Sequence, residues 1–131
     1  MKLLLDTQCL LWWFTEPERL NSAAIEQIAA EDNELFFSVA SAWEIAVKVG
    51  IGKLPLPEQV DIYVASRMRR LGAKSLDIVL PHVCRVATLP LLHRDPFDRI
   101  LLAQAQIEKM KLVTADEILS QYGIEILWAK G

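Results

Sequence analysis

The sequence predicts an α/β domain built around a mainly parallel sheet of five strands. Short apolar segments alternate along the 131 residues with longer segments in which apolar residues recur at helical spacing. No repeat, low-complexity tract or long linker interrupts this alternation. The length and the hydrophobic content of 53% suit one domain with its own core, so we expect a single domain over residues 1–131.

The first predicted strand is the most apolar. Three consecutive leucines follow Lys2 and precede Asp6. Because successive residues of a strand point to opposite faces, such a run indicates burial on both faces, as in a parallel sheet. By the same reasoning and by their position between helical segments, the five strands are expected at residues 2–6, 35–38, 73–77, 111–115 and 124–128.

The segments between these strands are predicted helices with recognisable ends. Asn21 and Ser41 are suitable N-cap residues, Pro57 suits a first helical turn, and Gly72 suits a helix C-terminus. The strongest amphipathic pattern begins at Pro96. Helices are therefore expected at residues 9–14, 21–29, 41–49, 58–71, 81–88, 96–110 and 117–122.

Composition favours a cytoplasmic protein. The apolar run after Met1 is too short for a secretory signal, and no stretch approaches the roughly 20 apolar residues that span a bilayer. Cys9 and Cys84 are far apart, and we expect both to be buried, reduced thiols. A net charge of -3 provides no global basic field for nucleic acid, although a local basic rim can still guide a phosphate backbone.

Four acids fall where parallel strands end or where the neighbouring helices begin. Asp6 ends the first strand, Glu44 lies near the start of the third helix, Asp98 opens the long helix, and Asp116 follows the fourth strand. The carboxyl ends of parallel strands share one edge of a sheet, where open α/β folds bind ligands. We therefore expect the four carboxylates to meet, provided that residues 89–94 return the chain to this edge.

Clustered carboxylates repel one another and require cations. A set of oxygen ligands alone, with no cysteine or histidine set nearby, suits Mg²⁺ or Mn²⁺ better than zinc. Such an ion activates water for phosphodiester hydrolysis. Each acid also has a structural alternative: Glu44 could close a capping box with Ser41, Asp95 and Asp116 could cap helices, and Asp6 could end a strand in a turn.

Four segments resemble the PIN-domain family and, within it, the VapC-type toxins of bacterial toxin–antitoxin pairs. They are LLLDT, SVASAWEIAVKVGIGKL, HRDPFDRILLAQA and LVTADEIL, which begin at Leu3, Ser38, His93 and Leu112 and occur in the family's order. The resemblance implies a three-layer α/β/α fold and a Mg²⁺- or Mn²⁺-dependent endoribonuclease. It also implies an antitoxin partner and a homodimer.

By motif match, the resemblance makes Asp6, Glu44, Asp98 and Asp116 the catalytic and metal-binding acids. Thr7 and Thr114 occupy positions where relatives place hydroxyls that steady the acids, and Asp95 is either a supporting residue or a helix cap. A basic rim near the motifs is the expected RNA contact. It comprises Lys48, Lys53, His93, Arg94 and Arg99.

Two other functions stay open at this point. A haloacid-dehalogenase-type phosphatase would carry a second acid two residues after Asp6, where this chain has Gln8. A non-catalytic binding module could use the same scaffold, because a fold does not fix a function. The apolar block from Leu10 to Phe14 could serve core packing, an antitoxin groove or a dimer contact.

Overall fold

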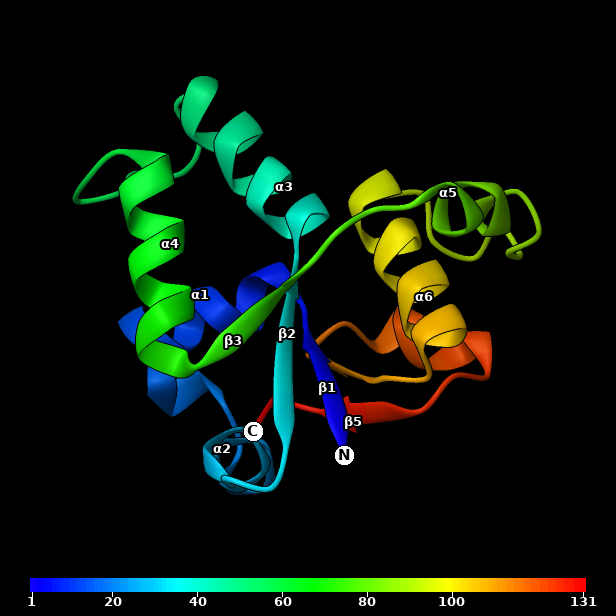
Figure 1. The fold of residues 1–131 in the computed structure, drawn as a ribbon, viewed down its shortest axis with the longest axis horizontal. Coiled ribbons are helices and arrows are strands. Elements are labelled where there is room, and N and C mark those ends of the chain that lie inside the picture. Colours follow the sequence, from blue (N-terminus) through cyan, green and yellow to red (C-terminus); the bar gives the residue numbers. More distant parts are fainter.

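A five-stranded sheet forms the centre of the molecule (Figure 1). The computed structural model describes residues 1–131. The strand order is β3-β2-β1-β4-β5, and all four pairings are parallel, so the predicted mainly parallel sheet is confirmed and has no antiparallel member. The strands are β1 (Lys2–Leu5), β2 (Glu34–Ser38), β3 (Ala73–Leu76), β4 (Lys111–Thr114) and β5 (Ile126–Trp128).

Six α-helices and two short 3₁₀ helices connect the strands, and all seven predicted helices are present. Asn21 caps its helix as predicted, since its side chain accepts a hydrogen bond from the Ala24 amide. Gly72 ends its helix with a φ of 74°, a left-handed conformation that glycine adopts readily. The elements are α1 (Thr7–Thr15), η1 (Pro17–Arg19), α2 (Ser22–Ala29), α3 (Val39–Gly50), α4 (Val60–Leu71), α5 (Leu80–Val86), α6 (Pro96–Glu108) and η2 (Glu117–Tyr122).

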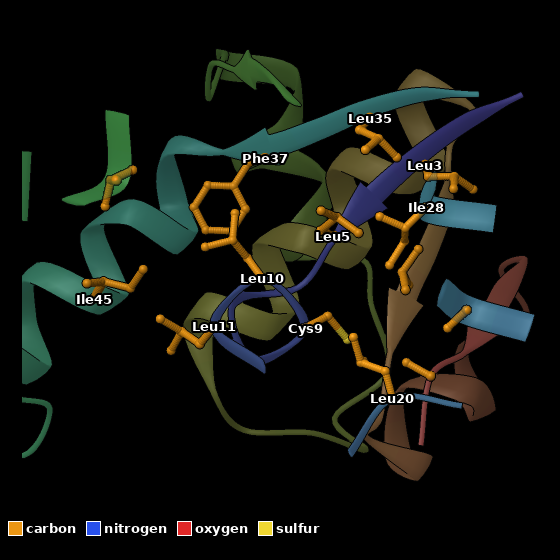
Figure 2. Packing of buried hydrophobic residues seen from close by; sticks show 14 of the residues in the cluster. Leu3, Leu5, Cys9, Leu10, Leu11, Leu20, Ile28, Leu35, Phe37 and Ile45 are labelled. Carbon is orange, nitrogen blue, oxygen red and sulfur yellow. The ribbon is translucent and has the colours of Figure 1, made fainter. Parts of the chain in front are cut away.

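The central strand β1 supplies side chains to both faces of the sheet. Leu3 and Leu5 join the core beneath α1, α2, α3 and α4, part of which Figure 2 shows. Leu4 joins a second core beneath α6 and η2. Full burial of all three leucines is what their consecutive apolar run predicts. Helices therefore cover both faces, which confirms the three-layer α/β/α architecture (Figure 1).

Some predicted helix boundaries are wrong by a few residues. The third helix begins at Val39 rather than Ser41, because Ser38 ends β2 and also caps the helix by accepting a hydrogen bond from the Ala40 amide. Glu44 consequently lies in the second helical turn and forms no capping box. The fourth helix begins at Val60, so Pro57 belongs to the preceding loop.

Cys9 is buried as predicted, and burial raises the pKa of its thiol, which keeps it protonated. Cys84 is exposed, so its predicted burial is wrong. It lies on α5, a short helix of seven residues that covers only the edge of the second core. None of the helices has the length and apolar character needed to span a membrane.

Candidate active site

An acidic cleft opens at the carboxyl ends of the central strands. Its volume is about 930 Å³, and all four predicted acids line it. Asp6 follows β1, Glu44 lies on α3, Asp98 lies in the first turn of α6, and Asp116 follows β4. The loop after α5 does return the chain to this edge, as the sequence requires for Asp95 and Asp98 to reach the cleft.

Asp6 is held rigidly at the bottom of the cleft. The residue is only 6% exposed. One carboxylate oxygen accepts a hydrogen bond from the Cys9 amide at 2.7 Å and thereby caps α1. The other oxygen accepts one from the Thr114 hydroxyl at 2.6 Å. Burial raises the pKa of Asp6 despite these two bonds, and repulsion from Glu44 adds to the shift.

Glu44 is as buried as Asp6, but its carboxylate forms an ion pair with a lysine. Its Oε1 accepts a hydrogen bond from the Thr7 hydroxyl, and its Oε2 accepts one from Lys48 at 2.7 Å. The bond to Glu44 is the largest effect on Lys48 and raises the pKa of that ammonium group, which therefore stays charged. The pair lies one helical turn apart on α3, where residues four apart are neighbours.

Thr114 connects the first and last acids. Its hydroxyl donates to Asp6 and accepts a hydrogen bond from the Asp116 amide at 3.1 Å. Asp116 in turn caps η2 by accepting a hydrogen bond from the Ile118 amide. Both predicted threonines thus form hydrogen bonds with the acids. Asp6 and Asp116 each cap a helix and also line the cleft, so the two interpretations of these acids are compatible.

Asp98, like Asp6, has a raised pKa. Burial, followed by repulsion from Asp95 and Asp6, raises its pKa from 3.8 to about 7, while His93 opposes the shift. Asp95 caps α6 by accepting a hydrogen bond from the Phe97 amide. This bond supports the cap interpretation of Asp95, although its side chain also lines the cleft.

His93 contacts two of the acids directly, a position that sequence reasoning did not predict. Its Nε2 atom lies 2.8 Å from Asp116 and 3.2 Å from Asp98. Its Nδ1 atom accepts a hydrogen bond from the Asp95 amide. Ligand atoms of His93, Asp98 and Asp116 all lie within 4.8 Å of one another. The sequence placed His93 in a family motif and in the basic rim expected to contact RNA, and gave no sign that it contacts the acids.

Hydrogen bonds with Tyr122 and Arg99 hold the loop that carries His93. The Tyr122 hydroxyl accepts hydrogen bonds from the amides of His93 and Leu92, at 2.7 and 3.2 Å. The Arg99 guanidinium donates to four backbone carbonyls of this loop and of the end of α5, those of Val86, Leu89, Pro90 and His93. Arg99 therefore holds the loop in place, and its predicted contact with RNA stays a prediction. No sequence signal singled out Tyr122.

We expect Tyr122→Phe to lower the free energy of unfolding by about 1–2 kcal/mol, because two amides lose their acceptor. Urea unfolding of both proteins measures the difference. Tyr63→Phe is a matched control, since the Tyr63 hydroxyl makes no hydrogen bond in the structure although the ring is buried. Equal losses in the two variants would show that the hydroxyl of Tyr122 contributes nothing specific.

The remaining predicted basic residues lie at different distances from the acids. Lys53 lines the cleft, whereas Arg94 is exposed and makes no ion pair or hydrogen bond within the protein. The structure adds Lys130, from the C-terminal end of the chain, and Trp12 to the cleft wall. Neither was predicted, because only the folded chain brings the end of the sequence next to α1.

The comparisons with known proteins agree with this geometry. The family model described as "PIN domain" matches residues 3–125. Ribonuclease VapC22 of Mycobacterium tuberculosis is 32% identical over 122 residues, which cover 91% of this chain and 90% of the relative. Ribonuclease VapC16 of the same organism is 48% identical over 50 residues, but that match spans only 38% of this chain and 36% of the relative.

Solved structures share the fold at low sequence identity. VapBC2 from Rickettsia felis, bound to a promoter DNA fragment, has a TM-score of 0.75 at 15% identity and covers 99% of this chain and all of its counterpart. VapBC-1 from nontypeable Haemophilus influenzae has a TM-score of 0.69 at 12% identity, with 98% of each chain covered. The family match over nearly the whole chain and the relative at 32% identity show that this chain belongs to the PIN-domain family.

Proposed function

We propose that this protein is a metal-dependent endoribonuclease, the toxin of a toxin–antitoxin pair. The observation that carries the proposal is the convergence of Asp6, Glu44, Asp98 and Asp116, from four separate elements, in one cleft. Metal dependence is a general property of PIN domains, and the two curated relatives are named ribonucleases. Four acids around one cleft exceed what helix capping requires.

The residues present fit Mg²⁺ or Mn²⁺. The donors are carboxylate oxygens, which hard divalent cations prefer. Burial, together with repulsion between neighbouring acids, raises the pKa values of Asp6 and Asp98, and a bound cation would stabilise their charged forms. Asp6, Asp98 and Asp116 would hold the ion, with Glu44 as the fourth acid. Of the four acids, Glu44 needs the charge of the metal ion least, since Lys48 already neutralises its carboxylate.

When bound, such an ion supplies an activated water and stabilises negative charge on a phosphate. The side chains of this protein provide the fixed geometry around it. Hydrogen bonds from Thr114 and from the Cys9 amide orient Asp6, and Thr7 and Lys48 orient Glu44. Because the carboxylates are ordered before substrate binds, little reorganisation accompanies the reaction.

The cleft also carries the positive charge that a polyanionic substrate requires. Lys48, Lys53 and Lys130 line its wall, and Arg94 is exposed on the loop next to Asp95. We propose that these four residues contact the phosphates of the RNA backbone. Such contacts position a nucleic acid without reading its sequence. Lys48 has a double role in this assignment, since it also holds Glu44.

The partners follow from the same proposal. The two solved structures described above are VapBC complexes, which supports an antitoxin as the partner of this chain. A homodimer is the second expected assembly. Its best support is an exposed apolar stripe at helical spacing along α3, formed by Val39, Trp43, Val47 and, just after the helix, Ile51. Trp43 alone is 60% exposed. A cytoplasmic location stays a prediction from the sequence.

Removal of the metal tests the proposed activity directly. Purified protein without any partner is incubated with total cellular RNA in Mg²⁺ or Mn²⁺, and then with excess EDTA. We expect cleavage that EDTA abolishes and that fresh Mg²⁺ or Mn²⁺ restores, because the ion lowers the pKa of its bound water and stabilises the charge that develops on the phosphate. Turnover of a small phosphomonoester without RNA cleavage would favour the phosphatase alternative. Antitoxin binding without metal affinity would favour the binding module.

A further inference from the structure

We propose that His93 is a positioning residue of the metal centre, which holds the Asp98 and Asp116 carboxylates together through an Nε2–H donor and does not itself bind the metal. The inference deepens the proposed function and rests on it. It depends on three features that the structure shows separately: the partners of the two ring nitrogens, the attachment of the loop, and the distances to the two acids.

The partners of the imidazole fix its tautomer. The Asp95 amide donates to Nδ1 at 3.1 Å, so the lone pair of that nitrogen is occupied and it carries no proton. A neutral imidazole has one N–H group, which must then be on Nε2. This N–H faces the oxygens of Asp116 at 2.8 Å and of Asp98 at 3.2 Å, both of which are acceptors.

The same assignment argues against His93 as a ligand. A metal requires the free lone pair of a ring nitrogen. Nδ1 has given its lone pair to the Asp95 amide, and Nε2 carries the proton. Coordination of a metal through Nε2 would require either that the ring lose its remaining N–H proton and become an imidazolate, or that the hydrogen bond from the Asp95 amide to Nδ1 break. The geometric cluster of His93, Asp98 and Asp116 is therefore better explained as one donor shared by two acceptors.

The attachment of the loop explains why the donor stays in place. The backbone of His93 is held on both sides, its amide by Tyr122 and its carbonyl by Arg99. Its side chain is only 14% exposed. Asp98 and Asp116 come from different elements and repel each other, so a fixed donor between them keeps both carboxylates at the distance that a shared cation needs. Partners that orient metal ligands typically contribute about 10–100-fold to metal affinity.

The other histidine is an internal control with the same hydrogen-bonding pattern. Nδ1 of His82 accepts a hydrogen bond from the Val79 amide at 3.1 Å, and its Nε2 lies 2.7 Å from Glu108. His82 is buried, and its carboxylate partner Glu108 at the end of α6 is not one of the cleft acids. Substitution of His82 therefore reports the structural cost of losing such an imidazole without any effect on the acids.

The test measures Mg²⁺ affinity by titration calorimetry, without RNA, for His93→Ala, His93→Gln, His82→Gln and the unsubstituted protein. Glutamine keeps an N–H donor at about the position of Nε2, whereas alanine removes it. We expect His93→Ala to weaken Mg²⁺ binding at least about tenfold, and His93→Gln and His82→Gln to remain within about threefold. Long-range ¹H–¹⁵N spectra should show His93 protonated at Nε2 only, both without metal and with saturating Mg²⁺.

Three results would overturn the assignment: protonation of His93 at Nδ1, an unchanged Mg²⁺ affinity in His93→Ala, or an equal loss in His93→Gln and His93→Ala. The spectra keep the assignment falsifiable even if the alanine variant fails to fold, because protonation at Nδ1 would still overturn it. Because none of these measurements uses RNA, they stand apart from the proposed activity. Cleavage could prove absent while His93 still positions the acids, or could be present while His93 has no effect on the metal.

Discussion

Asp6→Asn is expected to lower the rate of RNA cleavage at least about a thousandfold, which corresponds to about 4 kcal/mol of transition-state stabilisation. Asparagine removes the negative charge at the bottom of the cleft, where the metal needs it. The fold should survive, because asparagine caps helices as well as aspartate does. The Thr114 hydroxyl can also rotate to accept a hydrogen bond from the new amide. Initial rates at saturating Mg²⁺, with circular dichroism of both proteins, measure the effect.

Asp95→Asn is the matched control for this experiment. It removes a negative charge from the same cleft but keeps the N-cap bond to the Phe97 amide, so cleavage should change only a few-fold if Asp95 is a cap. An Asp6→Asn protein that cleaves at the full rate would contradict the site assignment. A loss in Asp95→Asn as large as that in Asp6→Asn would make Asp95 a fifth acid of the site.

The metal-free protein should lose stability as the pH rises from about 4 to about 7, and Asp98→Asn should remove much of this loss. The folded-state pKa of Asp98 is about 7, above the value of 3.8 for a free aspartate. The folded protein thus binds more protons than the unfolded chain between these values. Such a group stabilises the fold most at low pH, and that contribution is lost as the pH rises through 7.

Urea unfolding in EDTA at pH 5.5 and pH 8.0 measures this effect. At pH 8.0 we expect Asp98→Asn to be more stable than the unsubstituted protein by on the order of 1–3 kcal/mol, and at pH 5.5 the difference should be about half as large. Asp61→Asn, exposed at the start of α4, controls for the loss of one negative charge. Excess Mg²⁺ at pH 8.0 should stabilise the unsubstituted protein, since the cation binds only the folded state. A variant less stable than its parent at pH 8.0 would contradict the prediction.

The sequence by itself determined the sheet and the elements that carry the acids. Local patterns are sufficient for this, because consecutive apolar residues such as Leu3 to Leu5 require burial on both faces of a strand. Strand ends carry functional residues in parallel sheets, so the positions of Asp6 and Asp116 in the chain are enough to assign both to one edge. The two threonines came from the family resemblance, and both bond to the acids.

Only the tertiary structure decided which charged side chains are free to act. Arg99 and Arg94 look equivalent in the sequence. In the structure, Arg99 donates hydrogen bonds to four carbonyls of the loop and of the end of α5, while Arg94 has no partner in the protein. Tyr122 and His93 are 29 residues apart, and their hydrogen bond depends on how η2 packs beside α6. Hydrogen bonds of this kind are directional and long-range, so no local pattern of residues predicts them, whereas hydrophobic periodicity is local and can be read directly from the chain.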